Sequence, residues 1–315
     1  MKKLDETAII RIFQQKLNRR FTPEDVEVAK LGTTRVVTKV DTLVQSTDIP
    51  LQMSMKDAAR KSVVACISDF AAKGVKPELG IISINLPKTV SHSTVNQIAR
   101  GFKIASEEFQ IKIIGGDTNE GKEFVFTVCI FGKANKITPR KGADEGDIIF
   151  VTGPFGYTAS GLKILLERAQ AKNKFIKKAT RTVFKPIPRL EWGLRYKNYF
   201  SSSMDSSDGL STTLNEMAEQ SNKKFIIDNI PVNKDLYEFV NKNKIELIDL
   251  VFHGGEEYEF VFTVPEKNKS RIKKFALQTN TPIIEIGHVE KGKGVFFKHN
   301  GKIVSLRDLG WHHFK

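Results

Sequence analysis

The spacing of apolar residues along the chain switches repeatedly between a helical and a strand period. In the first half, apolar residues recur every three to four positions in three segments, which predicts helices at residues 5–20, 54–74 and 93–109. Between them, short runs rich in Val, Ile and Thr predict strands at residues 34–44, 79–86, 111–114 and 123–134. The last run, "EFVFTVCIFGKA", alternates most clearly and is the strongest strand pattern.

The second half of the chain repeats this alternation. Helical patterns cover residues 156–172, 188–197, 211–221 and 266–278, and strand patterns cover residues 148–153, 224–228, 258–264, 282–289 and 294–304. The polar segment "PRKGADEGD" at residues 139–147 separates the two halves. Because 315 residues exceed the size of most single-core domains, we expect two domains, at residues 1–142 and 143–315. Both have the element order of α/β domains with mixed sheets.

The composition is that of an ordinary globular protein, with 40% hydrophobic and 27% charged residues. No apolar run reaches the roughly 20 residues of a membrane span. The first residues, "MKKLDETAII", contain early acids and do not resemble a secretory signal. The two cysteines, Cys66 and Cys129, lie in separate apolar segments, which favours buried, reduced thiols. We therefore expect a cytoplasmic protein.

The formal net charge of +14 raises the question of nucleic-acid binding. The basic residues concentrate at residues 172–181 and 266–275, in patterns typical of solvated helix faces. The sequence has no zinc-finger spacing, RNA-binding signature or recognition-helix pattern, so nucleic acid is disfavoured as a partner. A positive field would equally attract small phosphorylated ligands.

The segment "IIGGDTNEGKE" nearly matches a phosphate-binding P-loop. Gly116 is followed after four residues by Gly121 and Lys122, but Glu123 replaces the required Ser or Thr. A P-loop also leads into a helix whose N-terminus holds the phosphates, whereas a predicted strand follows here. We therefore reject the P-loop and place Lys122 in a surface turn. The remaining candidates in this predicted loop are Gly116 and Asp117.

Acidic residues recur along the chain, several of them beside Gly, Ser or Thr at the predicted ends of elements: Asp25, Asp41, Asp69, Asp117, Asp205, Asp208, Glu256 and Glu257. Asp69 instead interrupts the apolar pattern of a predicted helix. Each could be a helix cap or turn residue. Clustered carboxylates, however, repel by about 4 kcal/mol per pair at 4 Å and an effective dielectric constant of 20. A shared cation relieves this, and oxygen ligands with phosphate favour Mg²⁺. The residues alone thus predict phosphoryl chemistry without specifying a substrate.

Nine motifs, taken in order, extend the argument: "VDTLVQSTDIP", "CISDFAAKGVKP", "IIGGDT", "PRKGADEGD", "TGPFGYTASGL", "KPIPR", "MDSSDGL", "HGGEEYEF" and "GWHHF". Together they resemble the thiamine-monophosphate kinase family in order and spacing. The resemblance implies an α/β (α+β) chain with the two-domain fold of aminoimidazole ribonucleotide synthetase, whose N-terminal domain pairs across a homodimer. It also implies in-line phosphorylation of thiamine monophosphate to thiamine diphosphate, with ATP as co-substrate and several Mg²⁺ ions, as the last step of thiamine diphosphate biosynthesis.

The resemblance also implies roles for individual residues, with Asp117 and Asp208 as the catalytic pair. The implied metal ligands are Asp25, Asp41, Asp69, Asp117, Asp205 and Asp208. The implied ATP contacts are Gly116, Asp117, Arg140 and Ser207. The implied contacts to thiamine monophosphate are Asp48, Glu256 and Trp311.

The sequence departs from the family pattern at several of these positions. Glu24 replaces the first acid of the usual "GDD", Val40 replaces a hydroxyl residue before Asp41, and Asp48 stands where His is frequent. Glu257 replaces the Asp of "GGED". These changes put individual metal shells in doubt, above all the one that would use residue 40.

Two other classes of function stay open at this stage. One is another ATP-dependent enzyme of the same superfamily, such as aminoimidazole ribonucleotide synthetase or selenophosphate synthetase. The second of these normally has a reactive cysteine near its N-terminus, and here no cysteine precedes Cys66. The other class is a non-catalytic protein that binds a phosphorylated ligand or nucleic acid.

Overall fold

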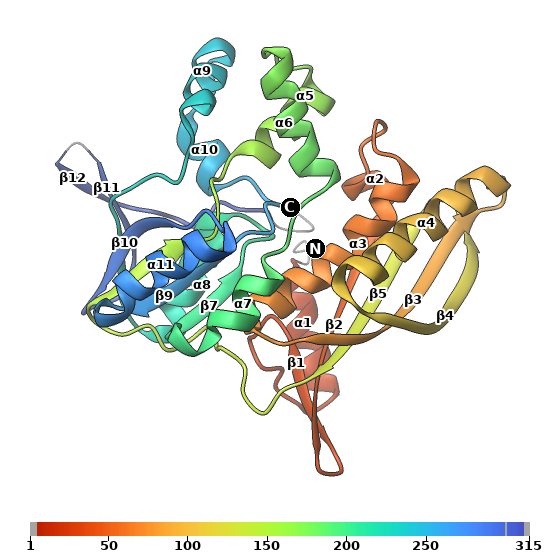
Figure 1. The fold of residues 1–315 in the computed structure, drawn as a ribbon, viewed down its shortest axis with the longest axis horizontal. Helices are drawn as coiled ribbons and strands as arrows, with labels where there is room; N and C mark the ends of the chain where they lie inside the picture. The colour runs from red at the N-terminus through yellow and green to blue at the C-terminus, as the bar shows by residue number, and fades with distance from the viewer. Residues whose placement is uncertain (1–4, 300, 312–315) are drawn as a thin grey trace.

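The computed structural model describes residues 5–299 and 301–311, which form two β-sheets with helices packed on them (Figure 1). The first sheet has the strand order β1-β2-β5-β3-β4. Its strands are β1 (Glu27–Leu31), β2 (Thr34–Val44), β3 (Pro77–Pro87), β4 (Lys112–Gly121) and β5 (Val125–Lys133). β3 and β4 are parallel and the other neighbours are antiparallel, so the sheet is mixed, as predicted.

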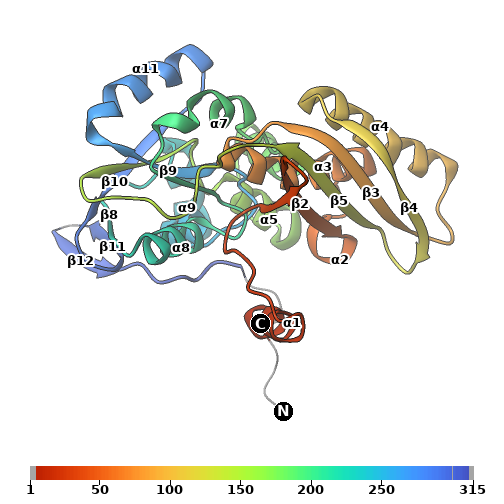
Figure 2. The ribbon, with the colours of Figure 1, turned by 90° about the horizontal axis from the view of Figure 1, so that it is seen from below.

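Helices cover one face of this sheet. The helices of this half are α1 (Glu6–Lys16), α2 (Gln45–Asp48), α3 (Met55–Lys73) and α4 (His92–Phe109). Along β5 the odd-numbered side chains are partly exposed and the even-numbered ones are buried. The buried ones, including Val128 and Ile130, pack in one core with residues of α3 and α4. The opposite face has no helix on it among the described residues (Figure 2).

The central element is α3. Ser54 caps its start by accepting the N–H of Asp57, and Gly74 ends it in a left-handed conformation with φ of 63°. Every residue from Ala58 to Lys73 is buried. The helix is buried all round because it contacts strands β2 and β5, helices α4 and α7, and strand β7 of the second sheet. It therefore carries side chains into the boundary between the two halves.

The predicted loop at "GGDT" is wrong, because strand β4 continues through it to Gly121. Parallel pairing with β3 joins Gly116 to Ile82 and Asp117 to Ser83. A Cβ atom on residue 116 would lie 1.7 Å from the carbonyl oxygen of Ile82, so only glycine fits this strand contact. Lys122 lies in a bend and strand β5 follows, which confirms the rejection of a P-loop.

The second sheet has the order β12-β11-β8-β10-β6-β9-β7. Its strands are β6 (Asp147–Val151), β7 (Ser202–Asp205), β8 (Lys224–Ile227), β9 (Phe260–Pro265), β10 (Ile284–Glu290), β11 (Gly294–His299) and β12 (Lys302–Ser305). The pattern at 294–304 had predicted one strand, but the chain forms the antiparallel pair β11 and β12 instead.

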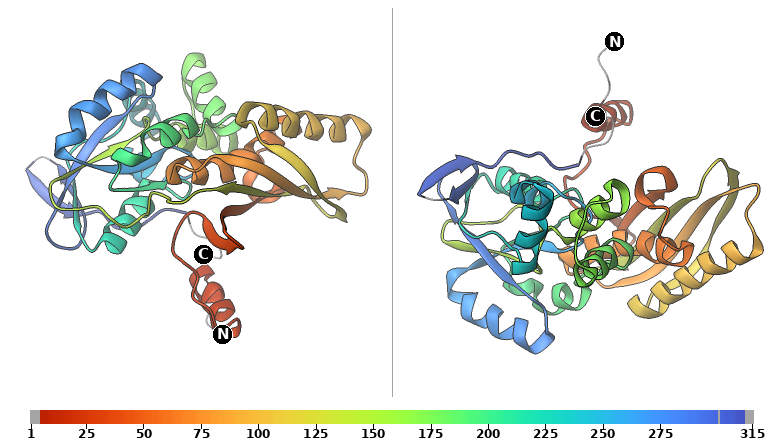
Figure 3. Two further views of the ribbon diagram at one scale, coloured as in Figure 1. Left: turned by 60° about the horizontal axis from the view of Figure 1, so that its bottom comes forward. Right: turned by 90° about the horizontal axis from the view of Figure 1, so that it is seen from above.

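Helices pack around this second sheet (Figures 1 and 3). They are α5 (Tyr157–Glu167), α6 (Asn173–Phe184), α7 (Leu190–Tyr196), α8 (Leu210–Ser221), α9 (Lys234–Asn243), α10 (Leu247–Phe252) and α11 (Lys269–Thr279). Single 3₁₀ turns lie at Lys197–Tyr199 and Glu266–Asn268. Three of the helices lie outside the predicted helical ranges: α6, α9 and α10. α9 and α10 span three turns or fewer and give a weak periodic signal. For α6, the sequence indicated only basic residues typical of a helix face at residues 172–181.

Helix α1 stands apart from both sheets (Figures 2 and 3). Asp5 caps it by accepting the N–H of Ala8, yet none of its residues is buried. No helix in the described part of the chain is long and apolar enough to cross a membrane.

Candidate active site

Three carboxylates meet in the boundary between the two sheets. Asp25 precedes β1, Asp69 lies on α3 and Asp205 ends β7. One oxygen of each lies within 4.8 Å of the others, and all three residues are buried. Residues that are 44 and 136 positions apart in sequence thus form one cluster, which we call the acid cluster.

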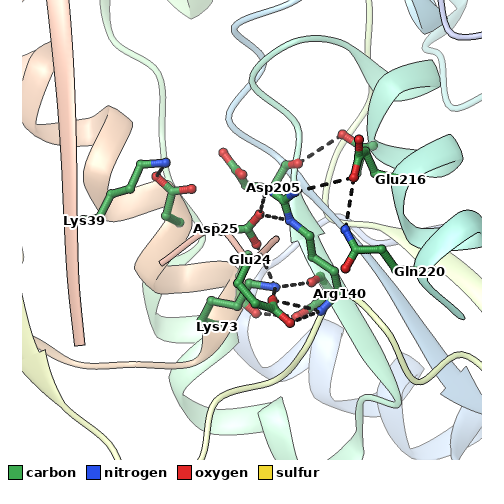
Figure 4. A network of polar contacts seen from close by, with 12 residues as sticks. Glu24, Asp25, Lys39, Lys73, Arg140, Asp205, Glu216 and Gln220 are labelled. Carbon is green, nitrogen blue, oxygen red and sulfur yellow. Dashed lines mark hydrogen bonds and ion pairs between the residues drawn. The ribbon is translucent and has the colours of Figure 1, made fainter. Parts of the chain in front are cut away.

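Two cations bind the Asp25 side of the acid cluster (Figure 4). The Lys73 Nζ lies 2.8 Å from Asp25 Oδ2 and 2.9 Å from Glu24, and it donates to the Ser203 carbonyl at 2.7 Å. The Arg140 Nε and Nη2 lie 2.6 and 2.5 Å from Asp25 Oδ1. Burial would raise the pKa of Asp25, but Lys73 and Arg140 lower it below its usual value.

The other two carboxylates have less positive charge around them. Burial, followed by the charge of Asp25, raises the pKa of Asp205 to about 7, although Ser68 Oγ donates to it at 3.0 Å. Burial also raises the pKa of Asp69 far above its usual value, against the opposing charge of Lys39, whose Nζ lies 3.2 Å away. Asp205 and Asp69 therefore hold a proton more readily than a free carboxyl group does, and a bound divalent cation would favour their ionised forms.

The donor set of the acid cluster fits Mg²⁺. It offers carboxylate oxygens, which hard cations prefer, and both Asp69 and Asp205 have a pKa raised by burial, so a bound cation would stabilise their charged forms. Beside Asp205, the Ser206 Oγ is fully buried and has no hydrogen-bond partner among the described residues. An unsatisfied buried hydroxyl is costly, and a hydrated cation or a phosphate would satisfy it.

Asp41 lies close to the acid cluster without belonging to it. It sits on β2, two residues from Lys39, and its register partner is the buried Val128, so it points to the helix-covered face. Burial would lower the pKa of Lys39, but Asp69 and then Asp41 raise it above its usual value. Asp41 thus adds negative charge to the same region.

Ser207 and Asp208 follow Asp205 in the turn that leads into α8. Asp208 is exposed, and its carbonyl accepts the backbone N–H of Trp311 at 2.8 Å. This contact places Trp311, the last described residue, beside the turn that follows Asp205 of the acid cluster. The Trp311 side chain is 57% exposed, so the ring is accessible to a ligand.

Asp117 lies on the other face of the N-terminal sheet. It pairs with Ser83, which pairs with Thr127, which pairs with Thr42, and paired residues share a face. The Thr42 and Thr127 hydroxyls lie 3.0 Å apart there. Asp117 is exposed and accepts a hydrogen bond from Asn119 at 2.6 Å. Within a single subunit, Asp117 therefore lies on the opposite face of the sheet from the acid cluster and does not join it.

Asp48 and Glu256 are joined by a lysine that sequence reasoning had missed. The Lys61 side chain is completely buried, and its Nζ lies 2.6 Å from Glu256 Oε1 and 3.2 Å from the carbonyl of Asp48. The Asp48 carboxylate accepts the Val44 N–H at 2.6 Å. The two residues implied to contact one substrate thus both contact one ammonium, Glu256 through its carboxylate and Asp48 through its backbone carbonyl.

The "GGEEYEF" segment connects these parts through its backbone. Glu256 has a positive φ of 62°, and its N–H donates to the Ser207 carbonyl at 2.6 Å. Glu257 is buried and accepts N–H donors at the start of α5, from Gly156 at 2.7 Å and Thr158 at 3.2 Å. Burial raises the pKa of Glu257 to about 7, against these hydrogen bonds.

Comparison with known proteins agrees with the geometry. Models of the AIR synthase related protein, N-terminal domain and C-terminal domain, match residues 23–134 and 144–300. The thiamine-monophosphate kinase of Nitrosopumilus maritimus is 58% identical over 315 residues, which cover all of both chains. The chain belongs to the thiamine-monophosphate kinase family. The resemblance inferred from the nine motifs and the two-domain mixed α/β fold are thereby confirmed.

More distant members of the thiamine-monophosphate kinase family match over the same length. The enzyme of Pyrococcus horikoshii is 33% identical over all of this chain and 98% of its own. The solved structure of AaThiL complexed with AMPPCP and TMP matches with a TM-score of 0.87 and 28% identity, over 99% of this chain and 98% of that one. E. coli HypE, a hydrogenase maturation protein, shares the fold alone, with a TM-score of 0.69 at 16% identity.

For this thiamine-monophosphate kinase family member, the sequence signal that revealed Asp69 would also have found two lysines. Asp69 was noticed because it interrupts an apolar helical pattern. Lys61 and Lys73 interrupt the same pattern and are both fully buried. A charged residue within a helix that is buried all round requires a partner, so each such residue marks a polar contact.

Proposed function

We propose that this protein transfers the γ-phosphoryl group of ATP directly to thiamine monophosphate in a Mg²⁺-dependent reaction. The observation that carries the proposal is the buried acid cluster, in a chain whose 58% identical relative is named thiamine-monophosphate kinase. AaThiL, the solved structure with AMPPCP and TMP, matches nearly the whole chain. ATP and thiamine monophosphate are accordingly the proposed substrates.

In this proposal the acid cluster holds the divalent ions. Mg²⁺ would neutralise phosphate charge and align the two phosphates, which is the main requirement of phosphoryl transfer. Asp25, Asp69 and Asp205 would supply ligands, with Asp41 and Asp208 nearby. Lys73 and Arg140 fix the Asp25 carboxylate in place. None of these side chains needs to form a covalent intermediate.

Arg140 and Gly116 keep their proposed roles in ATP binding under constraints that the structure adds. The Arg140 guanidinium is engaged by Asp25, so contact with a phosphate would require it to share that partner. The close contact of Gly116 with the Ile82 backbone requires glycine at this position whether or not the residue also contacts ATP. Ser207, at the turn before α8, has no such competing role among its described contacts.

The acceptor site would form around Lys61. Asp48 and Glu256 both contact its ammonium, and Trp311 lies beside the Asp208 turn. An exposed indole offers a flat surface on which a cationic thiazolium or a pyrimidine ring can stack. These residues are proposed to bind thiamine monophosphate.

We also propose a homodimer formed through the uncovered face of the N-terminal sheet. This face carries apolar side chains that a monomer leaves accessible, with exposed fractions of 54% for Val40 and 38% for both Leu79 and Ile81. Val40 and Ile81 both pair with Cys129, so they form a continuous row across three strands. Such a patch is typical of a protein interface. The face also carries Asp117, so in the proposed dimer this carboxylate would lie at the subunit interface.

A substrate panel tests the proposed function against the superfamily alternatives. The purified protein is given ATP and Mg²⁺ with thiamine monophosphate, with the precursor of aminoimidazole ribonucleotide, or with selenide, and ADP and AMP formation are followed. We expect ADP formation with thiamine monophosphate and none above background with the others. Turnover of another acceptor, or salt-dependent nucleic-acid binding without turnover, would replace the proposal.

A further inference from the structure

Lys39 contacts the acid cluster from a direction of its own. It lies on the helix-covered face of β2, with its side chain 24% exposed, and its Nζ is 3.2 Å from Asp69 Oδ2. Figure 4 shows it across the acid cluster from Lys73 and Arg140. Those two cations bind Asp25, whereas among the described residues Lys39 is the cation that pairs with Asp69.

The carboxylates that face Lys39 come from every element packed around it. They are Asp69 on α3, Asp41 on β2, Asp205 on β7 and Asp25 before β1, and all four raise the pKa of Lys39, against the effect of burial. The ammonium thus lies within reach of several carboxylates and in direct contact with Asp69. A divalent ion that binds Asp69 would meet one positive charge at contact distance.

We propose that Lys39 is a resident cation of the metal site, which competes with divalent ions for the Asp69 carboxylate. The protein then binds divalent ions more weakly, or binds one fewer, than its carboxylates would otherwise allow. Lys39 is in this sense a positioning and charge-balancing residue rather than a metal ligand. The inference rests on the proposed function only in taking the acid cluster as the metal site.

A purely structural role for Lys39 makes the opposite prediction. If its ammonium only holds Asp69 in place during folding, removing it would disorder a ligand and weaken metal binding. If its ammonium competes with metal, removing it would free one Asp69 oxygen for the ion and also remove a positive charge that repels the ion. Metal binding would then become tighter. The sign of the change in metal affinity therefore separates the two roles.

The test measures Mn²⁺ binding to the full-length protein by electron paramagnetic resonance and calorimetry, without nucleotide. The variants are Lys39→Met, Lys39→Gln as a second neutral residue in case the first does not fold, and Lys39→Arg, which keeps the charge. The control is Lys133→Met, which removes an exposed lysine of the same sheet that pairs with Glu78. Melting curves in chelator check that each variant is folded.

We expect both neutral variants to bind Mn²⁺ at least about tenfold more tightly, or to bind one additional ion, because a like charge a few ångströms away is removed. Lys39→Arg and Lys133→Met should bind as the unmodified protein does. Unchanged or weaker Mn²⁺ binding in the folded neutral variants would overturn the inference. Because this test uses no substrate, tighter Mn²⁺ binding together with failure to phosphorylate thiamine monophosphate would retain the inference and remove the proposed function.

Discussion

At the residue scale, the site depends on charged side chains that the fold removes from water together. Asp25, Asp69 and Asp205 repel one another, and Lys39, Lys73 and Arg140 lie against this group of charges. Glu24, which departs from the family pattern, pairs with Lys73 and accepts the Arg140 N–H at 3.1 Å. The departure therefore has a structural role in this chain, since it ties the Asp25 loop to its two cations.

The first prediction concerns Asp117. Its side chain is exposed and accepts a hydrogen bond from Asn119, so Asp117→Asn should leave the melting temperature unchanged. If the carboxylate acts on Mg²⁺ or phosphate in the assembled enzyme, turnover should fall by at least about 100-fold. Steady-state kinetics measure this, with Glu120→Gln on the same strand as a control. Wild-type turnover by Asp117→Asn would remove this acid from the site.

The second prediction concerns the pH dependence contributed by Glu257. Its folded pKa of about 7 lies above its ordinary value of 4.5, so the folded state holds a proton that the unfolded state releases between these values. The carboxyl group therefore destabilises the protein increasingly from pH 4.5 to 7, by about 3 kcal/mol in total, and by a constant amount above pH 7.

Glu257→Gln removes this titration while keeping an oxygen that can accept from Gly156 and Thr158. The free energy of unfolding of the variant, relative to the unmodified protein, should therefore rise between pH 4.5 and 7 and then level off. Denaturant titrations at pH 5, 6, 7 and 8 measure the difference. A difference that does not change with pH would show that Glu257 titrates normally.

The residue roles could be predicted from the sequence only in part. Asp25, Asp69 and Asp205 were all named beforehand, because acids beside Gly, Ser or Thr and an acid within an apolar helix are visible in the letters. Their meeting at one point was not visible, since it follows from how α3 packs between the two sheets. Lys39 was missed because a lysine in a strand is ordinarily a surface residue.

At the scale of elements, long periodic segments were predicted well and segments shaped by tertiary pairing were not. The helix predicted at 54–74 is observed as α3, where both ends carry clear caps. The predicted loop at Gly116 is a strand, because pairing with β3 outweighs the turn preference of two adjacent glycines. Local sequence does not reveal such a partner.

The third prediction concerns the pair that ties α7 to the second sheet. Arg189 binds both carboxylate oxygens of Glu259, with Nε 2.7 Å from Oε2, and Thr152 Oγ1 donates to the same carboxylate at 2.6 Å. Because Glu259 is only 8% exposed, Arg189→Met would leave a buried charge without its counter-ion. We expect a loss of about 3–5 kcal/mol in the free energy of unfolding.

Arg195→Met is the matched control for Arg189→Met. Arg195 lies on α7, which begins at the residue after Arg189, and its pair with Glu191 is solvent-exposed, so its loss should change the stability little. Equilibrium denaturation compares the two variants. Equal effects would mean that the burial of the Arg189–Glu259 pair has no energetic importance.

At the scale of the whole molecule, the two halves divide the proposed tasks. The first sheet provides Lys39 and Asp41 on one face and an apolar surface on the other, while the second supplies Asp205 and the "GGEEYEF" segment. The acid cluster requires both halves, because Asp69 and Asp205 lie on different sides of their boundary. Substitutions at that boundary should therefore weaken metal binding even where they leave the hydrophobic cores of both halves folded.

The fourth prediction concerns the proposed homodimer. The protein should elute with twice the 35.5 kDa mass of one chain in size-exclusion chromatography with light scattering. Ile81→Glu places a charge in the centre of the uncovered face and should shift the protein toward the monomer. Leu277→Glu, at an 86% exposed site on α11, should leave the mass unchanged. A monomeric unmodified protein at micromolar concentration would contradict the proposed dimer.

The central claim is that the γ-phosphoryl group of ATP moves directly to thiamine monophosphate. Its most direct measurement is the fate of label from [γ-³²P]ATP after incubation with the purified protein, Mg²⁺ and thiamine monophosphate. We predict that the label appears in the terminal phosphate of thiamine diphosphate, with one ADP formed per product. Label found in inorganic phosphate alone, or no thiamine diphosphate at any Mg²⁺ concentration, would contradict the account.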